Sequence, residues 1–378
     1  MRANISFIHN CYGCGVCSAS CSKKIISIKW NGDGFYEPVI LEPEKCTDCG
    51  ICLDVCAFNH KERALASEDI EIKAWAAWSN DEVIRKKCSS GGIGFEIGKQ
   101  LIEQGYHALG CRYDISKQRA EHYIAITVEE FVQSIGSKYI QSYTEEAFKQ
   151  IKRNGQKYLI TGTPCQIDSF RRMIRKFRCE DNFILMDFYC HCVPSMHAWK
   201  SYLRMLEPKI GKVTYASWRN KFNYGWHDSY LMGIDGQHTS IQSRMSQGDL
   251  FYKMFLGDVC LGPQCANECK YKYDKSSADI RIGDLWGPTY EKEEKGVSAL
   301  VAFTQKGRNV IDNLKGVTLV EHPFDVVAEG QMKENAKTKE LRPIFMLALR
   351  KGIKLDSILF KVLFNCQRVI GRIHRLFK

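Results

Sequence analysis

Two cysteine runs decide the N-terminal fold: residues 11–21 read CYGCGVCSASC, and residues 46–56 read CTDCGICLDVC. Both runs have the spacing C-x2-C-x2-C-x3-C. In this spacing, three cysteines hold one cubane iron–sulfur cluster and the fourth reaches across to the other cluster. The two predicted ligand sets are therefore crossed: Cys11, Cys14, Cys17 and Cys56 for one cluster, and Cys46, Cys49, Cys52 and Cys21 for the other.

A zinc knuckle and a disulfide framework are the alternatives for these runs. Structural zinc takes four ligands per ion and does not require two runs that each supply three ligands to one site and one ligand to the other. The spacing therefore favours iron–sulfur clusters. Ser22 and Ala57 stand where such runs usually carry a proline after the fourth cysteine. This departure affects the stiffness of the loops and leaves the ligand count unchanged.

Chain length and charge limit the possible domain organisation, location and partners of the protein. The 378 residues suggest one small and one large unit. The N-terminus has no basic region followed by a long apolar stretch, and no window reaches the roughly 18 apolar residues of a membrane span. We therefore expect a reducing cytoplasmic location for a chain with 18 cysteines. The net charge of +11 is concentrated in the tail, and no nucleic-acid motif is present, so we expect no nucleic acid partner.

The chain is expected to contain three parts. Residues 1–65 form a dicluster ferredoxin-like module in which Asn31-Gly32-Asp33-Gly34 turns a hairpin between the cysteine runs. The boundary lies near residues 58–70, where the sequence loses periodicity and gains charge. Residues 70–330 form the large unit, and residues 331–378 form a basic amphipathic helical tail.

Alternating strand and helix patterns predict a mixed-sheet α/β fold for the large unit. The expected strands are residues 73–79, 106–113, 122–128, 157–162, 183–189, 213–218, 228–234, 279–284 and 299–303. The expected helices are residues 93–104, 145–153, 165–177, 196–206, 247–256 and 307–314. Polar strands around residues 211–235 favour antiparallel pairing.

Two short segments are candidate sites for a phosphate-bearing cofactor. Cys88-Ser89-Ser90-Gly91-Gly92 follows a strand and opens a helix, where small residues let backbone N–H groups approach a phosphate. A well-capped helix without a ligand is the alternative. Gly136-Ser137-Lys138-Tyr139 precedes another helix, and Lys138 could bind phosphate or lie beside a flavin; a turn with a solvated lysine is equally consistent.

Further cysteines follow the strands of the large unit. Cys165 and Cys190 come after two predicted strands, and Cys260, Cys265 and Cys269 lie in CLGPQCANECKYK. The carboxyl ends of α/β strands converge on a crevice, so four of these cysteines could carry another cluster. Free cysteines also pack as small hydrophobic residues, which is our expectation for Cys111, Cys179 and Cys366.

These segments resemble the coenzyme F420 hydrogenase/dehydrogenase beta-subunit family of flavin and iron–sulfur proteins. The resemblance rests on Ser89-Ser90-Gly91-Gly92, Gly136-Ser137-Lys138-Tyr139, Gly162-Thr163-Pro164-Cys165-Gln166, Cys190-His191 with Val193-Pro194-Ser195, and Ala278-Asp279-Ile280-Arg281-Ile282-Gly283-Asp284. Together they span about residues 73–290. The chain looks closest to the branch found beside surface-polysaccharide genes, in which a dicluster ferredoxin module precedes the flavin domain.

The resemblance implies the cofactors of the large unit. It implies a third cubane on Cys165, Cys190, Cys265 and Cys269, and FAD contacts from Ser89, Ser90, Gly91, Gly92, Ser137, Lys138 and Tyr139. The chain departs from the family where C-x3-C replaces C-x2-C at Cys265 and Cys269, and where Cys192 replaces glycine. Cys192 or Cys260 could therefore replace one ligand.

The C-terminal tail has apolar residues at helical spacing, from Leu359 to Ile373, with basic residues opposite. From Arg342 to Lys378 there are nine Lys or Arg and one acid. A helix docked on the protein with a solvated basic face is one interpretation. A helix that makes a peripheral contact with anionic lipid is the other.

The expected function is that of an FAD-dependent iron–sulfur oxidoreductase. Clusters move single electrons and a flavin accepts a hydride, so a protein with both converts between the two modes. The expected partners are a small-molecule hydride donor or acceptor and a redox protein such as ferredoxin. Asp187, His191 and Asp284 are candidate acid–base groups, each equally consistent with a structural role. The alternative function is a non-catalytic electron-transfer subunit serving a partner enzyme, for example in surface-polysaccharide synthesis.

Overall fold

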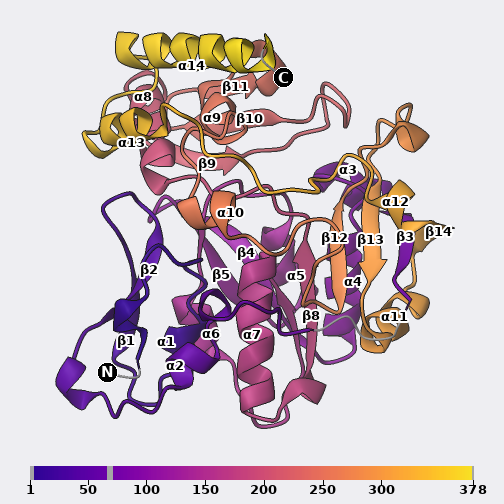
Figure 1. Ribbon diagram of the computed structural model, residues 1–378. Coiled ribbons are helices and arrows are strands. Elements are labelled where there is room, and N and C mark those ends of the chain that lie inside the picture. The colour runs from indigo at the N-terminus through magenta and orange to yellow at the C-terminus, as the bar shows by residue number, and fades with distance from the viewer. Residues whose placement is uncertain (1–3, 66–70, 377–378) are drawn as a thin grey trace.

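The computed structural model describes residues 4–65 and 71–376. Figure 1 shows a cysteine-rich N-terminal lobe beside a large sheet with helices on both faces, and a smaller sheet and the C-terminal helices at the opposite end. Within the described ranges, no helix is both long and apolar enough to cross a membrane.

The N-terminal lobe consists of two short helices and a hairpin: α1 (Val16–Ser20), β1 (Ile26–Trp30), β2 (Tyr36–Ile40) and α2 (Ile51–Asp54). The strands pair antiparallel from Ile26 with Ile40 to Trp30 with Tyr36, as the sequence predicts. Asn31 closes the turn because its side-chain oxygen accepts hydrogen bonds from the backbone of Asp33 and Phe35. The hairpin thus spaces the two cysteine runs.

The large sheet has nine strands in the order β14-β3-β13-β12-β8-β7-β4-β5-β6. The central pairs of β12 with β8, β8 with β7, and β7 with β4 are parallel, while the pairs toward β14 are antiparallel. The strands are β3 (Lys73–Ser79), β4 (His107–Asp114), β5 (Arg119–Ala125), β6 (Ser142–Tyr143), β7 (Tyr158–Thr161), β8 (Phe183–Phe188), β12 (Ile280–Asp284), β13 (Ser298–Ala302) and β14 (Val317–His322).

Alternate residues of the central strands face different cores, because successive side chains of a strand point to opposite sides. On β8, Ile184 and Met186 pack with α4 (Ile93–Glu103) and α11 (Gln305–Asp312). Phe183 and Leu185 pack instead with α6 (Glu145–Gln150) and α7 (Pro164–Lys176), the side on which α1 also lies. The N-terminal lobe is therefore held against the α7 face of the sheet.

The smaller sheet has the antiparallel order β11-β10-β9, with β9 (Val213–Ser217), β10 (Leu231–Gly236) and β11 (Ser240–Arg244). Its core includes the fully buried Trp199 and Trp218, together with aromatic residues of α9. The helices of this region are α8 (Met196–Ile210), α9 (Leu250–Phe255), α10 (Pro263–Asn267), α13 (Arg342–Arg350) and α14 (Ile358–Leu376). The short helices α3 (Glu82–Lys87) and α5 (Val128–Phe131) lie between strands of the large sheet, whereas α12 (Phe324–Val327) follows β14, the last strand in the chain.

Several sequence expectations need correction. The apolar spacing from Leu359 to Ile373 predicts the helix α14, but the sequence patterns miss α13, the other helix of the tail. The sequence patterns also miss the strands β6, β11 and β14, and β14 forms an edge of the large sheet. The expectation that Cys366 is a packed hydrophobic residue is wrong, because the structure leaves its side chain exposed on α14.

Candidate functional site

The structure sorts the eight N-terminal cysteines into two cavities. One cavity is lined by Cys11, Cys14, Cys17 and Cys56, and the other by Cys21, Cys46, Cys49 and Cys52. Each cavity thus draws three cysteines from one run and one from the other run, which is the crossed grouping that the spacing predicts. Tight backbone turns with positive φ at Gly13, Gly15 and Gly50 curl the two runs around these cavities.

In the inner of these cavities, the one lined by Cys11, all four cysteine side chains are buried. Burial raises the pKa of Cys11 well above its ordinary value and raises that of Cys56 to about 12. A bare thiolate would be costly in such surroundings, so these sulfurs need a positive partner to stay ionised. The Cys14 thiol is also anchored to the hydroxyl of Ser169 on α7, with 3.3 Å between Sγ and Oγ.

The outer cavity reaches the surface at Cys49, whose side chain is exposed. Asn4 closes this cavity: its side-chain nitrogen lies 3.6 Å from the sulfur of Cys46 and donates to Asp48 at 2.8 Å. In the described part of the chain, no three His, Cys, Asp or Glu side chains gather tightly enough for a single metal ion.

A third cavity of about 480 Å³ lies at the carboxyl ends of the central parallel strands. Cys165 begins α7 directly after β7, Cys190 follows β8, and Cys265 lies on α10. All three line the cavity together with Cys269 and Cys192. Their proximity shows in the pKa of Cys190, which is raised to about 12 mainly by burial and further by the neighbouring charges of Cys265 and Cys269.

The two alternative ligands differ in position. Cys192 lines the cavity, and its sulfur lies 3.9 Å from the carbonyl oxygen of Cys265. Cys260 is fully buried in the core around α8 and α9, where its thiol contacts the carbonyl of Met254 at 3.4 Å. Only Cys192 is therefore placed to replace one of the four expected thiols.

The two predicted cofactor segments meet at the same cavity. Ser89, Ser90, Gly92, Ser137, Lys138 and Tyr139 all line it. The backbone N–H of Ser137 donates to the hydroxyl of Ser89 at 2.8 Å, which joins the two segments directly. Gly91 does not line the cavity. Its backbone lies against β3, where an added Cβ would be 2.3 Å from the carbonyl oxygen of Ala77.

The ammonium group of Lys138 forms hydrogen bonds with the backbone just before it in the sequence. The group donates to the carbonyl oxygens of Ser134 at 2.9 Å, Ile135 at 3.0 Å and Gln133 at 3.3 Å. Burial lowers the pKa of Lys138 to about 8. In this conformation Lys138 can contribute charge to the cavity, while its three N–H donors are already paired.

Sequence reasoning missed the cations that hold the Ser89-Ser90 loop. The fully buried guanidinium of Arg219 donates to the carbonyl of Ser89 and the hydroxyl of Tyr139, both at 3.1 Å, and pairs with Asp284 at 3.1 Å. Lys221 donates to the carbonyl of Ser90 at 2.6 Å. A basic residue directly after the strand at 213–217 was the available signal, but its partners lie far away in the sequence.

The three acid–base candidates divide by environment. Asp187 forms a fully buried pair with Arg281 at 2.7 Å and has a structural role. Arg281 also donates to the carbonyl of Tyr273 at 2.8 Å, which fixes the segment after Cys269. Asp284 is held by Arg219 at the cavity wall, and His191 lines the cavity with Nε2 2.8 Å from the Asp258 carboxylate.

The third cavity fits a planar aromatic cofactor beside thiol ligands. Its volume lies within the roughly 300–1,000 Å³ of small-molecule sites, and aromatic side chains such as Phe188, Tyr230 and Trp286 line it. Within residues 4–65 and 71–376, four buried polar atoms of lining residues have no hydrogen-bond partner: Nδ1 of His122, Nε2 of Gln141 and the hydroxyls of Tyr189 and Tyr271. A ligand in the cavity could satisfy such groups.

Comparisons with known proteins match the cysteine-rich N-terminal lobe and the large unit to two different families. Residues 10–60 match the 4Fe-4S dicluster domain family, and residues 155–323 match the family formed by the C-terminal part of the coenzyme F420 hydrogenase/dehydrogenase beta chain. The chain is similar to F420 hydrogenase/dehydrogenase beta subunits. The Coenzyme F420 hydrogenase subunit beta of Methanococcus voltae is 24% identical over 241 residues, which cover 58% of this chain and 76% of that protein.

The F420 hydrogenase/dehydrogenase match includes Cys165, Cys190, Cys265 and Cys269, whereas both predicted FAD segments precede it. A chain in a structure titled "Xenon derivatization of the F420-reducing NiFe hydrogenase complex from Methanosarcina barkeri" has a TM-score of 0.45 and 16% identity, with 78% of this chain and 91% of that chain covered.

Tyr12 separates the third cavity from the inner N-terminal one, since it lines both. Its hydroxyl donates to the carbonyl of Glu268 at 2.7 Å. Its ring makes edge contacts with Phe58 and Tyr271, with ring centroids 5.2 and 5.9 Å away. The third cavity therefore lies next to the inner one. Cys17 of the inner cavity and Cys52 of the outer cavity belong to one buried cluster, so the three cavities lie in a row that ends at the exposed Cys49.

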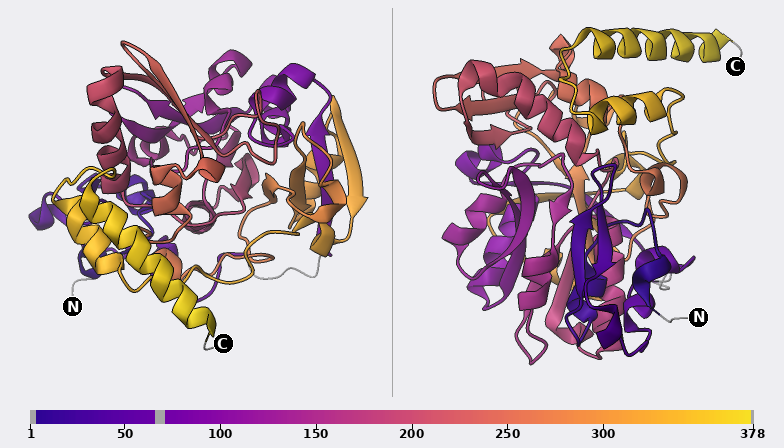
Figure 2. Two further views of the ribbon diagram at one scale, coloured as in Figure 1. Left: turned by 90° about the horizontal axis from the view of Figure 1, so that it is seen from above. Right: turned by 90° about the vertical axis from the view of Figure 1, so that its left-hand side faces the viewer.

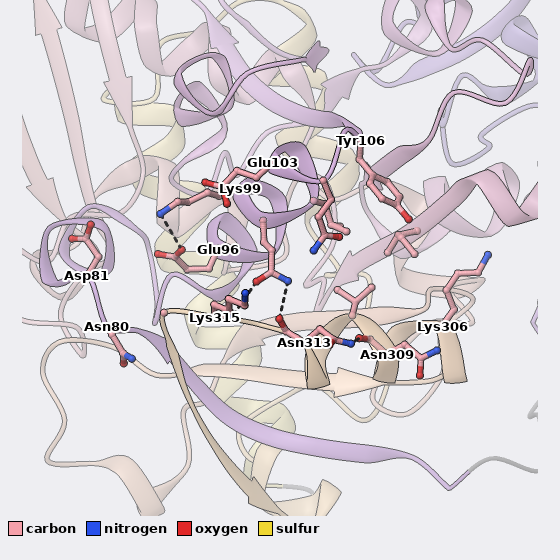
Figure 3. Close-up of a pocket in the computed structure, with 16 residues that line it drawn as sticks. Asn80, Asp81, Glu96, Lys99, Glu103, Tyr106, Lys306, Asn309, Asn313 and Lys315 are labelled. Carbon is pink, nitrogen blue, oxygen red and sulfur yellow. Dashed lines mark hydrogen bonds and ion pairs between the residues drawn. The ribbon is translucent and has the colours of Figure 1, made fainter.

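A separate groove of about 770 Å³ lies between α4 and α11 and shares no lining residue with this row (Figure 3). The side chain of Gln100 on α4 donates to the carbonyl of Asn313 at 3.0 Å and accepts from the backbone of Lys315 at 2.9 Å, so it binds the turn between α11 and β14. The polar side chains in this groove join two helices that cover one face of the sheet.

Proposed function

We propose that this protein is an iron–sulfur flavoprotein oxidoreductase that passes electrons between an organic hydride donor or acceptor and iron–sulfur clusters by way of FAD. One observation carries the proposal. A single cavity is lined by both predicted cofactor segments and by the four scattered cysteines, and Tyr12 in its wall also lines the inner N-terminal cysteine cavity.

The residues of each cavity define its proposed ligands. Cys11, Cys14, Cys17 and Cys56 would hold one cubane, and Cys21, Cys46, Cys49 and Cys52 the second. Cys165, Cys190, Cys265 and Cys269 would hold the third, with Cys192 as an alternative to one of these thiols. Thiolates at this spacing and in this number are typical of cubane ligation, which supports clusters over zinc.

The proposed FAD would occupy the end of the third cavity formed by Ser89, Ser90, Gly92, Ser137, Lys138 and Tyr139. A bound flavin supplies exchange between two-electron hydride chemistry and single-electron transfer. The chain's own contribution is placement: Arg219 and Lys221 hold the carbonyl oxygens of Ser89 and Ser90, so the loop keeps a fixed shape.

Cations and aromatic rings shape the thiol end of the same cavity. The ammonium of Lys272 binds the carbonyl oxygen of Cys190 at 2.8 Å, and its charge favours the thiolate forms of Cys190 and Cys269. Tyr12 and Tyr271 exclude water from the contact with the inner N-terminal cavity. Because such thiolate ligation needs a reducing compartment, we propose that the reaction takes place in the cytoplasm.

The second candidate function is an electron-transfer subunit with no organic substrate of its own. The similarity to a protein named as a hydrogenase subunit supports it, as does the exposed Cys49, where a redox partner protein could contact the outer cavity. Synthesis of a surface polysaccharide is one process in which such a partner could act. Ferredoxin is the simplest partner of either candidate function.

An anaerobic reduction experiment tests the proposal. The purified full chain is mixed in turn with reduced deazaflavin, NADH and NADPH while flavin and cluster absorbance are followed. The oxidoreductase predicts bleaching by at least one of these donors. Bound flavin that responds to none of them, but is reduced through added ferredoxin, would favour the relay. Absence of flavin from the denatured protein would contradict the oxidoreductase.

A further inference from the structure

Helix α14 presents an apolar face that points away from the protein. Five large aliphatic side chains lie on it at helical spacing, with exposed fractions of 79% for Ile358, 51% for Val362, 50% for Val369, 46% for Ile373 and 82% for Leu376. At 100° per residue, these positions share one side of the helix. Exposed aliphatic side chains aligned in this way mark a contact surface rather than a solvated face.

A different face of α14 fixes the helix to the body of the protein. Phe360 and Leu363 are buried, and the rings of Phe360 and Phe364 lie 5.9 and 5.2 Å from that of Phe345 on α13. Farther along the helix, the side chain of Gln367 donates to Glu340 at 2.8 Å. The outward apolar face is therefore not the surface by which α14 docks on its own chain.

A basic strip runs beside the outward face. It consists of Lys361, Arg368, Arg372 and Arg375, and the sequence has no Asp or Glu from Ser357 to Leu376. Among the described residues, none of these four side chains forms an ion pair, whereas His374 on the docked side pairs with Glu340 at 3.2 Å. The strip is thus free to meet negative charge from outside the chain.

We propose that α14 lies in the plane of an anionic lipid bilayer surface, with its aliphatic face in the acyl boundary and the basic strip among the head groups. An apolar face flanked by Lys and Arg is the pattern that binds such interfaces. A second copy of this chain is the weaker candidate, since it would bring the same positive strip into contact with this one.

The position of α14 in the fold is compatible with this proposal. Figures 1 and 2 show the helix along one end of the molecule, whereas the start of the chain lies toward the other end, and Figure 1 shows α2 there as well. A bilayer against α14 would leave the surface at Cys49 open to a redox partner. The proposal concerns attachment alone and does not depend on the cofactors.

Vesicle co-sedimentation of the full chain tests this attachment. The probes are vesicles of phosphatidylcholine alone and vesicles that also contain phosphatidylglycerol. We expect binding to the anionic vesicles only, and a loss of roughly tenfold or more in affinity for Val369→Asp combined with Ile373→Asp. Arg368→Gln combined with Arg372→Gln should weaken binding and reduce its dependence on salt concentration.

The matched control is Ile126→Asp combined with Val132→Asp, two exposed aliphatic positions outside α14. This variant should bind anionic vesicles as the unaltered chain does, and circular dichroism should report the same helix content for all variants. Equal binding to both vesicle types, or no binding, would overturn the proposal. Dimers in light scattering that Val369→Asp with Ile373→Asp converts to monomers, without vesicle binding, would assign the face to a second copy instead.

Discussion

Arg219 is the residue on which the shape of the proposed cofactor loop depends most. Its guanidinium is fully buried, and it joins Asp284 to the carbonyl of Ser89 and the hydroxyl of Tyr139. Its charge also lies over the ring of Tyr230, 4.4 Å from the ring centroid. These contacts bring together segments that are far apart in the sequence, so one side chain ties the loop to the rest of the cavity wall.

Replacing Arg219 should therefore affect both stability and cofactor content. Arg219→Ala leaves the Asp284 carboxylate without its buried partner, and we expect the free energy of unfolding to fall by about 3–5 kcal/mol. The purified variant should also retain less flavin. Chemical denaturation and flavin analysis of the anaerobic protein measure the two effects.

Arg244→Ala is the matched control for Arg219→Ala. Arg244 pairs with Asp228, and both side chains are partly exposed. An ion pair in contact with water contributes little to stability. We therefore expect the free energy of unfolding to change by about 1 kcal/mol or less, and the flavin content to stay normal. Equal effects of the two substitutions would show that the cavity does not depend on the buried cation.

At the scale of elements, helix α4 is set by its contact with α5. Gly98 lies in the interior of α4, where an added Cβ would be 2.1 Å from the ring of the buried Phe131. The helix can therefore approach α5 closely only because this position has no side chain. This contact places the N-terminus of α4, and with it Gly92 and the serine loop, at the cavity.

A pair of glycine substitutions tests this contact. Gly98→Ala should lower the free energy of unfolding by about 1–3 kcal/mol, because overpacking against Phe131 outweighs the gain in helix propensity. Gly371→Ala on α14 is the matched change, since no atom lies within 4 Å of the added Cβ, and it should raise stability by up to about 1 kcal/mol. Thermal unfolding should show a lower melting temperature for Gly98→Ala and an unchanged or higher one for Gly371→Ala.

The sequence was most informative where the pattern is local. Cysteine spacing predicted the grouping around the two N-terminal cavities, and the Asn31 turn predicted the hairpin, because neighbours in sequence decide both. The edge strand β14 and the tie from Arg219 to Ser89 were missed, since each depends on pairing across more than a hundred residues. The exposure of Cys366 likewise depends on which face of α14 docks on α13.

At the scale of the whole molecule, the three cysteine-lined cavities form one row. It begins at the carboxyl ends of β7 and β8, passes Tyr12, and ends at the exposed Cys49. The row links the predicted 4Fe-4S dicluster domain to the region that resembles F420 hydrogenase/dehydrogenase beta subunits. This geometry favours electron transfer along the row over a purely structural role for the thiols.

Anaerobic iron and flavin analysis of the purified full chain tests this account most directly. We expect about twelve irons and about one flavin per chain, and about eight irons for Cys165→Ser combined with Cys190→Ser. Cys179→Ser with Cys366→Ser, which removes two thiols that line none of the three cavities, should leave both values unchanged. About eight irons without flavin in the unaltered chain would contradict a cluster and a flavin in the third cavity.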